Sequence, residues 1–241
     1  MNGKNTRTAS LIGEAAVDRL ASARVIIFGI GGVGGYVLEA LARAGVGHIT
    51  VVDSDTVSES NINRQLLATQ STTGKKKVEA ARERVLDIGG VDIECVDAFY
   101  LPENASDFDL GAYDYIADCI DTVSAKLDIA ERAYSLSIPI VSSMGTANKL
   151  DATKLRVCDV NETSVCPLAR VMRTELRKRG VKKLRVVYSE EKARVPISDE
   201  LDRNGRRVPA SISYVPAAAG ILIAQEIILG LTRDLVPDTA K

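Results

Sequence analysis

The sequence lacks tryptophan, and its 241 residues include one histidine and only 4% aromatic residues. This composition disfavours binding through rows of stacked aromatic side chains, and we expect an aliphatic core. Lysine and arginine total 31 against 32 aspartate and glutamate residues. The near balance excludes a chain that is basic throughout, so any nucleic acid would have to meet a local basic patch. Because 46% of the residues are apolar, a wholly disordered chain is also excluded.

The cysteines form no C-x-x-C pair, so we expect no structural zinc; they are Cys95, Cys119, Cys158 and Cys166. The start, MNGKNTRTAS, has no apolar run and predicts no signal peptide. The longest apolar stretch, near 215–231, is interrupted by Gln225 and Glu226. It predicts a buried core helix rather than a membrane span. We therefore expect a cytoplasmic protein with reduced thiols and no membrane contact.

Apolar runs alternate with amphipathic segments along the chain. Strands are predicted at 24–28, 48–53, 91–97, 113–118 and 138–143, with a weaker one at 154–160. Helices are predicted at 33–44, 75–87, 122–137, 164–180 and 214–231, and a mobile loop at 189–211. The alternation predicts an α/β fold: a Rossmann-like, mostly parallel sheet with helices on both faces. We expect one domain over 1–241, with a core at 5–165 and a C-terminal α/β extension at 166–241.

A glycine-rich turn follows the first predicted strand and precedes a helix. Its sequence is G-x-G-x-x-G, with glycines at Gly29, Gly31, Gly32 and Gly34. Such a turn lets the backbone approach a phosphate, and the helix N-terminus supplies N–H donors. Asp53 ends the second strand, where a carboxylate can accept hydrogen bonds from ribose hydroxyls. The motif alone does not separate NAD from ATP, and an ordinary turn with a strand-end cap is the alternative.

Several cations follow Asp53, and a dinucleotide enzyme has no need for them there. A triphosphate does, because fixed Arg and Lys groups stabilise the charge that builds as pyrophosphate leaves. Arg64 and Lys77 are the candidates, whereas Lys75 and Lys76 are expected at the surface. The alternative is a solvated helix face with ordinary surface cations.

Asp121 follows the fourth predicted strand, at the sheet edge where ligands bind. It opens the next helix, so it would serve either as an N-cap or as a ligand of Mg²⁺ beside phosphate oxygens. Position alone leaves both readings open.

These motifs occur in the order found in a known family. G-I-G-G-V-G, D-S-D, N-I-N-R-Q, G-K-K-K-V-E and D-C-I-D-T resemble the ubiquitin-activating-type adenylating enzymes over residues 5–165. The resemblance implies ATP and Mg²⁺ as cofactors, with the ribose on Asp53, the phosphates on Arg64 and Lys77, and the metal at Asp121. It also implies that the nucleotide pocket is lined by Asp55, Asn61 and Gln65.

The resemblance extends to the N-terminus. Thr6-Arg7-Thr8 matches an arginine that reaches the phosphates, in several members from the partner subunit. That implies a homodimer and a catalytic role for Arg7. Without the resemblance, this polar terminus would be predicted to be disordered.

The sulfur-carrier branch of that family typically has two C-x-x-C zinc pairs, which this chain lacks. Residues 165–170 (VCPLAR) and 207–216 (RVPASISYVP) instead resemble the tRNA threonylcarbamoyladenosine dehydratase branch. This implies a tRNA substrate and ATP-dependent cyclisation of a modified adenosine through an acyl-adenylate. Adenylation of a ubiquitin-like sulfur carrier is the first alternative, and an NAD-binding oxidoreductase or redox module is the second. A sulfur-handling protein partner also remains open.

A local basic patch fits an RNA. Between Arg170 and Arg194 the chain carries a net charge of +7. Arg170, Arg173 and Arg177 share one face of the predicted helix, next to Lys178, and such a face would neutralise RNA phosphates. A solvated face is the alternative.

Two further hypotheses concern this half of the chain. Cys166, at the helix start, is the one thiol to test as a nucleophile, and the loop would add RNA contacts through Arg203, Arg206 and Arg207.

Overall fold

The computed structural model describes residues 3–201, 205 and 207–236. A seven-stranded sheet has the order β3-β2-β1-β4-β5-β7-β6. Its strands are parallel except for the last pair, in which β6 runs antiparallel to β7. The strands are β1 (Arg24–Phe28), β2 (His48–Val52), β3 (Asp92–Val96), β4 (Tyr115–Asp118), β5 (Ile140–Ser143), β6 (Leu155–Asp159) and β7 (Arg185–Ser189).

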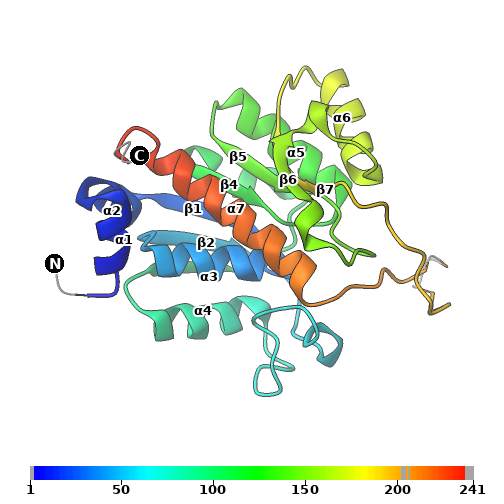
Figure 1. Cartoon of the computed structure of the whole chain (residues 1–241), viewed down its shortest axis with the longest axis horizontal. Helices are drawn as coiled ribbons and strands as arrows, with labels where there is room; N and C mark the ends of the chain where they lie inside the picture. Colours follow the sequence, from blue (N-terminus) through cyan, green and yellow to red (C-terminus); the bar gives the residue numbers. More distant parts are fainter. Residues whose placement is uncertain (1–2, 202–204, 206, 237–241) are drawn as a thin grey trace.

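Helices cover both faces of the sheet (Figure 1). They are α1 (Thr6–Ile12), α2 (Glu14–Ser22), α3 (Gly34–Ala44), α4 (Lys77–Ile88), α5 (Val123–Ser135), α6 (Pro167–Lys178) and α7 (Tyr214–Thr232). Side chains of β1 alternate between the faces: Val25 and Ile27 join the core under α3 and α7, and Ile26 and Phe28 join the core under α5. Burial on both faces explains why this strand is a continuous apolar run. The predicted α/β fold with helices on both faces is confirmed.

Helix α7 crosses the sheet diagonally and lies beside α3 (Figure 1). By length and composition it could span a membrane, as no other described helix could, but 44% of its apolar window is buried inside the protein. A Cβ added at Gly220 would lie 2.5 Å from the carbonyl oxygen of Val33. This close approach packs α7 against the start of α3, where the glycine-rich turn ends. Here α7 serves as a core helix.

Local sequence alone gives the wrong structure for β7 and for the N-terminal segment. The strand β7 was missed, and Ser189, assigned to the loop, is its last residue. The N-terminus is helical around Arg7 rather than disordered, because Lys4 donates to the carbonyl oxygens of Ala42 and Gly89 and ties this segment to α3 and α4. The described parts of 190–213 contain no helix or strand beyond a bridge between Leu201 and Arg207. Arg203 and Arg206 lie outside the described residues.

Candidate active site

A pocket of about 560 Å³ opens where the strand order reverses, between β1 and β4. In parallel α/β sheets, ligands bind in the crevice at this point. The pocket brings together most of the residues that the sequence singled out: Gly29, Gly31, Gly32, Asp53, Asp55, Asn61, Arg64, Gln65, Lys77 and Asp121. Gly34 lies just behind them at the start of α3, whereas Arg7 is exposed on α1 and is not among the lining residues.

The glycines of the turn have distinct roles. Gly29 has a φ of +80°, which glycine adopts without strain. A Cβ at Gly34 would lie 1.8 Å from the carbonyl oxygen of Gly29, so only glycine lets the helix pack here. A Cβ at Gly31 would meet nothing closer than the Gln65 amide at 3.7 Å, so the backbone faces open pocket. The turn therefore fits a phosphate group at the start of α3.

The Asp53 carboxylate ties the glycine turn to the end of β2. One oxygen accepts from the backbone N–H of Ile30 and the other from that of Asp55, both at 2.9 Å. The side chain is only 9% exposed. Each oxygen keeps a second lone pair for a ribose hydroxyl, so the predicted ribose contact is compatible with this geometry.

Lys77 is a buried cation between two carboxylates. Its Nζ lies 2.7 Å from Asp55 and 3.7 Å from Asp53, and its side chain is 6% exposed. Arg64 lines the pocket beside Gly32, and it donates to the carbonyl oxygen of Ser60 and to the side chain of Asn63. Phosphates entering the pocket would find these two cations already oriented. By contrast, Lys75 and Lys76 pair outside the pocket, with Glu83 and Asp97, as predicted for surface residues.

Asp121 is exposed in the pocket between β4 and α5. The N-cap residue of α5 is Thr122, so the N-cap reading of Asp121 is wrong. Among the described residues, no group of three or more His, Cys, Asp or Glu side chains is arranged to hold a metal. A single carboxylate beside phosphates is nonetheless what Mg²⁺ uses, since it retains waters and takes phosphate oxygens as ligands. The residues present therefore fit Mg²⁺ bound together with a nucleotide.

The far half of the pocket was not found from the sequence. It is lined by Phe99, residues 143–147, Leu168, Val208, Pro209 and Ser211. Asn148 holds the 208–211 wall in place by exchanging two hydrogen bonds of 2.8 Å with the backbone of Ala210. Asn63 also donates to the carbonyl oxygen of Ser211. This wall lies far from the glycine turn in sequence, and only the motif at 207–216 drew attention to it.

The thiols are poorly placed for nucleophilic chemistry. Cys119 lines the pocket, but burial raises its pKa far above the ordinary value. Burial likewise raises the pKa of Cys95 and of Cys158. Cys166 is only 5% exposed at the start of α6, so the hypothesis that it acts as an accessible nucleophile is not supported.

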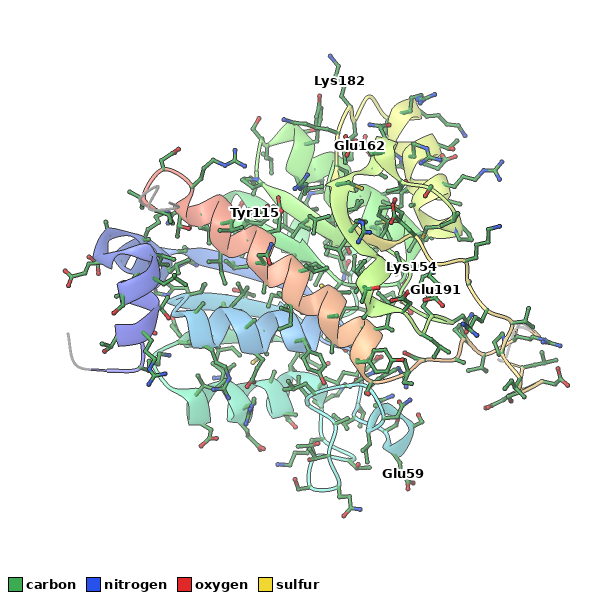
Figure 2. All side chains as sticks on the ribbon, viewed as in Figure 1. Glu59, Tyr115, Lys154, Glu162, Lys182 and Glu191 are labelled. Atoms are coloured by element: carbon green, nitrogen blue, oxygen red, sulfur yellow. The ribbon has the colours of Figure 1, made fainter. Side chains whose placement is uncertain are left out.

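The basic helix α6 begins at the pocket, where Leu168 lines the wall. Arg170 and Arg177 are exposed on it. Arg173 is half-buried instead, because it donates to the carbonyl oxygen and the hydroxyl of Thr163 and so ties α6 to the preceding turn. Lys178 pairs with Glu175. The three-arginine face is therefore reduced to two exposed arginines, and Lys182 extends into solvent beyond the helix (Figure 2).

Comparison with known proteins agrees with this geometry. The ThiF family model matches residues 4–240. The tRNA threonylcarbamoyladenosine dehydratase of Bacillus subtilis is 35% identical, over 95% of each chain. The crystal structure of the E. coli enzyme TcdA in complex with ATP superposes with a TM-score of 0.86, 30% identity and coverage of 95% of this chain and 94% of that one. Molybdopterin-synthase adenylyltransferase of Salmonella typhimurium is 34% identical over 62% of this chain and 59% of its own. The chain belongs to the ThiF family.

Proposed function

We propose that this protein is an ATP-dependent enzyme that cyclises threonylcarbamoyladenosine in tRNA through an acyl-adenylate. Membership of the ThiF family alone does not specify a tRNA substrate, but one observation in this structure supports it. A single pocket runs from the glycine turn to Leu168 at the start of α6, and the same helix exposes Arg170 and Arg177. A nucleotide bound at the turn and an RNA bound along α6 would therefore meet in one cavity.

The first step activates the carboxylate of the modified base. A carboxylate oxygen attacks the α-phosphorus of ATP, a P–O bond forms, and pyrophosphate leaves. Lys77 and Arg64 stabilise the charge that moves onto the departing phosphates. Mg²⁺ held at Asp121 would neutralise phosphate oxygens. Asp53 orients the ribose while it holds the turn.

The second step closes the ring. The carbamoyl nitrogen of the same side chain attacks the activated carbonyl carbon, loses its proton, and AMP leaves with the bridging oxygen. Well-oriented intramolecular attack reaches effective molarities of about 10⁵ M or more, so no thiol of the protein is required. The raised pKa of Cys119 and the burial of Cys166 are consistent with this route and disfavour transfer through a thioester on either thiol.

The partners follow from the same proposal. The tRNA contacts α6, and the protein acts as a cytoplasmic homodimer in which Arg7 reaches the phosphates of the other subunit. The family assignment argues against the NAD-binding alternative, because the relatives are named as adenylating or tRNA-modifying enzymes. Mg²⁺, the dimer and any sulfur-handling partner are parts of the proposal.

The test is mass spectrometry of nucleosides from tRNA bearing threonylcarbamoyladenosine, after incubation with the protein and ATP-Mg²⁺. We expect the modified base to lose one water only when ATP is present. Replacing ATP by an analogue whose α,β-bridging oxygen is a methylene should abolish the change. An intact base with active, folded protein would contradict the proposal, and pyrophosphate release with a carrier protein ending in Gly-Gly would then support the first alternative.

A further inference from the structure

A buried ion pair lies next to the candidate active site, and neither of its residues lines the pocket. Lys126 on α5 and Asp118 at the end of β4 are both 0% exposed. The Lys126 Nζ lies 2.9 Å from each carboxylate oxygen of Asp118. Ser142 on β5 donates its hydroxyl to the same carboxylate at 2.5 Å. These three side chains join α5, β4 and β5.

The ammonium of Lys126 has a further acceptor in the loop that carries Asp121. It donates to the carbonyl oxygen of Ile120 at 3.0 Å. Ile120 directly precedes Asp121. An ammonium has three N–H donors, so one Lys126 side chain can satisfy both the Asp118 carboxylate and this carbonyl. An apolar pair at these positions would fill the space without fixing the loop.

The glycine turn holds the other side of the same loop. A Cβ at Gly29 would lie 3.0 Å from the Ile120 side chain and 3.1 Å from the backbone of Cys119. A Cβ at Gly34 would lie 3.2 Å from Cβ of Cys119. The loop is thus held between the glycine turn and Lys126, and the hydrogen bond from Lys126 sets its distance from the turn.

We propose that Lys126 is a positioning residue for Asp121. By holding the Ile120 carbonyl, it places the Asp121 carboxylate at the distance from the glycine turn that lets Mg²⁺ bind together with the ATP phosphates. The Asp118 carboxylate orients the lysine, and Ser142 only adds a further hydrogen bond to that carboxylate. The inference rests on the proposed function for the metal role of Asp121.

The experiment compares variants by the gain in ATP affinity that Mg²⁺ provides, measured calorimetrically as the ratio of Kd in EDTA to Kd in Mg²⁺. The Asp118→Leu/Lys126→Met double variant removes both charges, so neither is left buried without its partner. Ser142→Ala is the matched control, since it spares the contact between Lys126 and Ile120. Asp121→Ala gives the value for a site without its metal carboxylate.

We expect the double variant to lose about tenfold or more of the Mg²⁺-dependent gain, and we expect the same loss for Asp121→Ala. The ATP affinity of the double variant in EDTA should be unchanged. Ser142→Ala should keep the gain. The Mg²⁺ concentration for half-maximal pyrophosphate release should rise in parallel. A merely structural role would lower the melting temperature without moving either Mg²⁺ readout.

A folded double variant with the wild-type gain would overturn the positioning role and leave the proposed function intact. If the double variant does not fold, Asp118→Asn/Lys126→Met takes its place under the same criteria, because it keeps the shape of residue 118, leaves no buried charge and has no donor at residue 126 for the Ile120 carbonyl. Failure of both to fold also overturns the inference, because the cluster then serves the fold alone. If the wild type binds ATP without any gain from Mg²⁺, the metal role of Asp121 fails, and the positioning role fails with it.

Discussion

Lys77 has carboxylate partners in this structure, at the place where the proposed reaction needs a phosphate partner. Its ammonium lies 2.7 Å from Asp55, whose side chain is 64% exposed. An incoming triphosphate would offer a stronger, more buried set of negative charges than this half-solvated carboxylate. Asp55 would thus hold the Lys77 side chain in place until ATP arrives. Preorganised charge of this kind lowers barriers because it needs no rearrangement during reaction.

Replacing Lys77 with alanine tests this role. We expect kcat for ATP-dependent pyrophosphate release to fall about 10²-fold or more, because a cation aimed at the departing phosphates is lost. Lys75→Ala is the control, because Lys75 is two residues before Lys77 in the sequence and pairs with Glu83 at the surface. Equal turnover in the two folded variants would contradict the assignment of Lys77.

Glu191 is a buried carboxylate that holds the segment just after the pocket-lining residues 143–147. Figure 2 shows it beside the segment near Lys154, and its carboxylate accepts from the backbone N–H groups of Leu150 and Asp151. The Asp151 amide is the largest cause that lowers the pKa of Glu191 below its ordinary value of 4.5, against the opposing effect of burial. The carboxylate therefore stabilises the fold above pH 4.5, and this contribution is lost as the pH falls through the lowered pKa.

We expect Glu191→Gln to reduce the free energy of unfolding at pH 7 by about 1–3 kcal/mol, because hydrogen bonds to a charged acceptor are lost. The difference from wild type should shrink as the pH falls below 4.5. Thermal unfolding over a pH series measures it. Glu190→Gln, whose side chain is 43% exposed beside Arg156, should show little effect at any pH. A pH-independent loss in Glu191→Gln would point to packing instead of charge.

At the scale of elements, the arginines of α6 have two different roles: Arg173 holds the helix to the preceding turn, whereas Arg170 and Arg177 are exposed to solvent. The spacing of the three arginines in the sequence predicts one shared helix face. It does not reveal that the Arg173 guanidinium donates a hydrogen bond to the Thr163 hydroxyl. We therefore expect Arg170→Glu/Arg177→Glu to weaken tRNA binding. The slope of log Kd against log salt concentration should fall by about two, which corresponds to the loss of two phosphate contacts. ATP affinity should stay unchanged. A filter-binding series in salt measures this.

The control for α6 is a charge reversal at another part of the surface, just before α4 and on it. Lys75→Glu/Arg82→Glu changes the same number of charges at the α4 side of the molecule. This control variant should keep the wild-type slope of log Kd for tRNA against log salt concentration. If both double variants lose affinity equally, tRNA binding follows net charge and not the face of α6.

The elements that the sequence predicted well have local signals. The β1 strand, the glycine turn and α3 follow one another directly, so strand pattern, turn chemistry and helix start agree within 21 residues, 24–44. By contrast, β7 is a five-residue strand among charged residues, and its place between β5 and β6 depends on pairing over long sequence distances. The helix α1 depends on Lys4 reaching two distant helix ends. No local pattern reveals such contacts.

The candidate site divides in the same way. Residues near the glycine turn were found because each follows a strand or matches a motif, whereas the wall at 143–147 and 208–211 is assembled by tertiary contacts such as that of Asn148 with Ala210. Lys126 did leave a signal that was missed. It stands on the apolar stripe of α5 with Ile129, Ala130 and Ala133, and a lysine on such a stripe indicates a buried charge that needs a partner.

At the scale of the whole molecule, Arg7 is separate from the other two cations proposed to bind the phosphates, since Arg64 and Lys77 line the pocket. Arg7 is exposed on α1 and does not line the pocket. Apolar side chains are also exposed at Leu11 on α1 and at Ile221 and Leu229 on α7, at 79%, 49% and 50%. Both features fit the proposed homodimer, in which a second copy covers apolar surface and supplies its arginine to the neighbouring pocket.

Subunit mixing tests this arrangement directly. Arg7→Ala and Lys77→Ala each inactivate a homodimer if both residues act on the phosphates. When the two inactive proteins are mixed and allowed to exchange subunits, half of the dimers are hybrids. If Arg7 acts across the interface, each hybrid contains one intact site and one doubly altered site, so about a quarter of wild-type activity should return. If Arg7 acts within its own chain, every site stays defective and no activity returns, although sedimentation shows dimers. A protein that sediments as a monomer while fully active would contradict the shared site altogether.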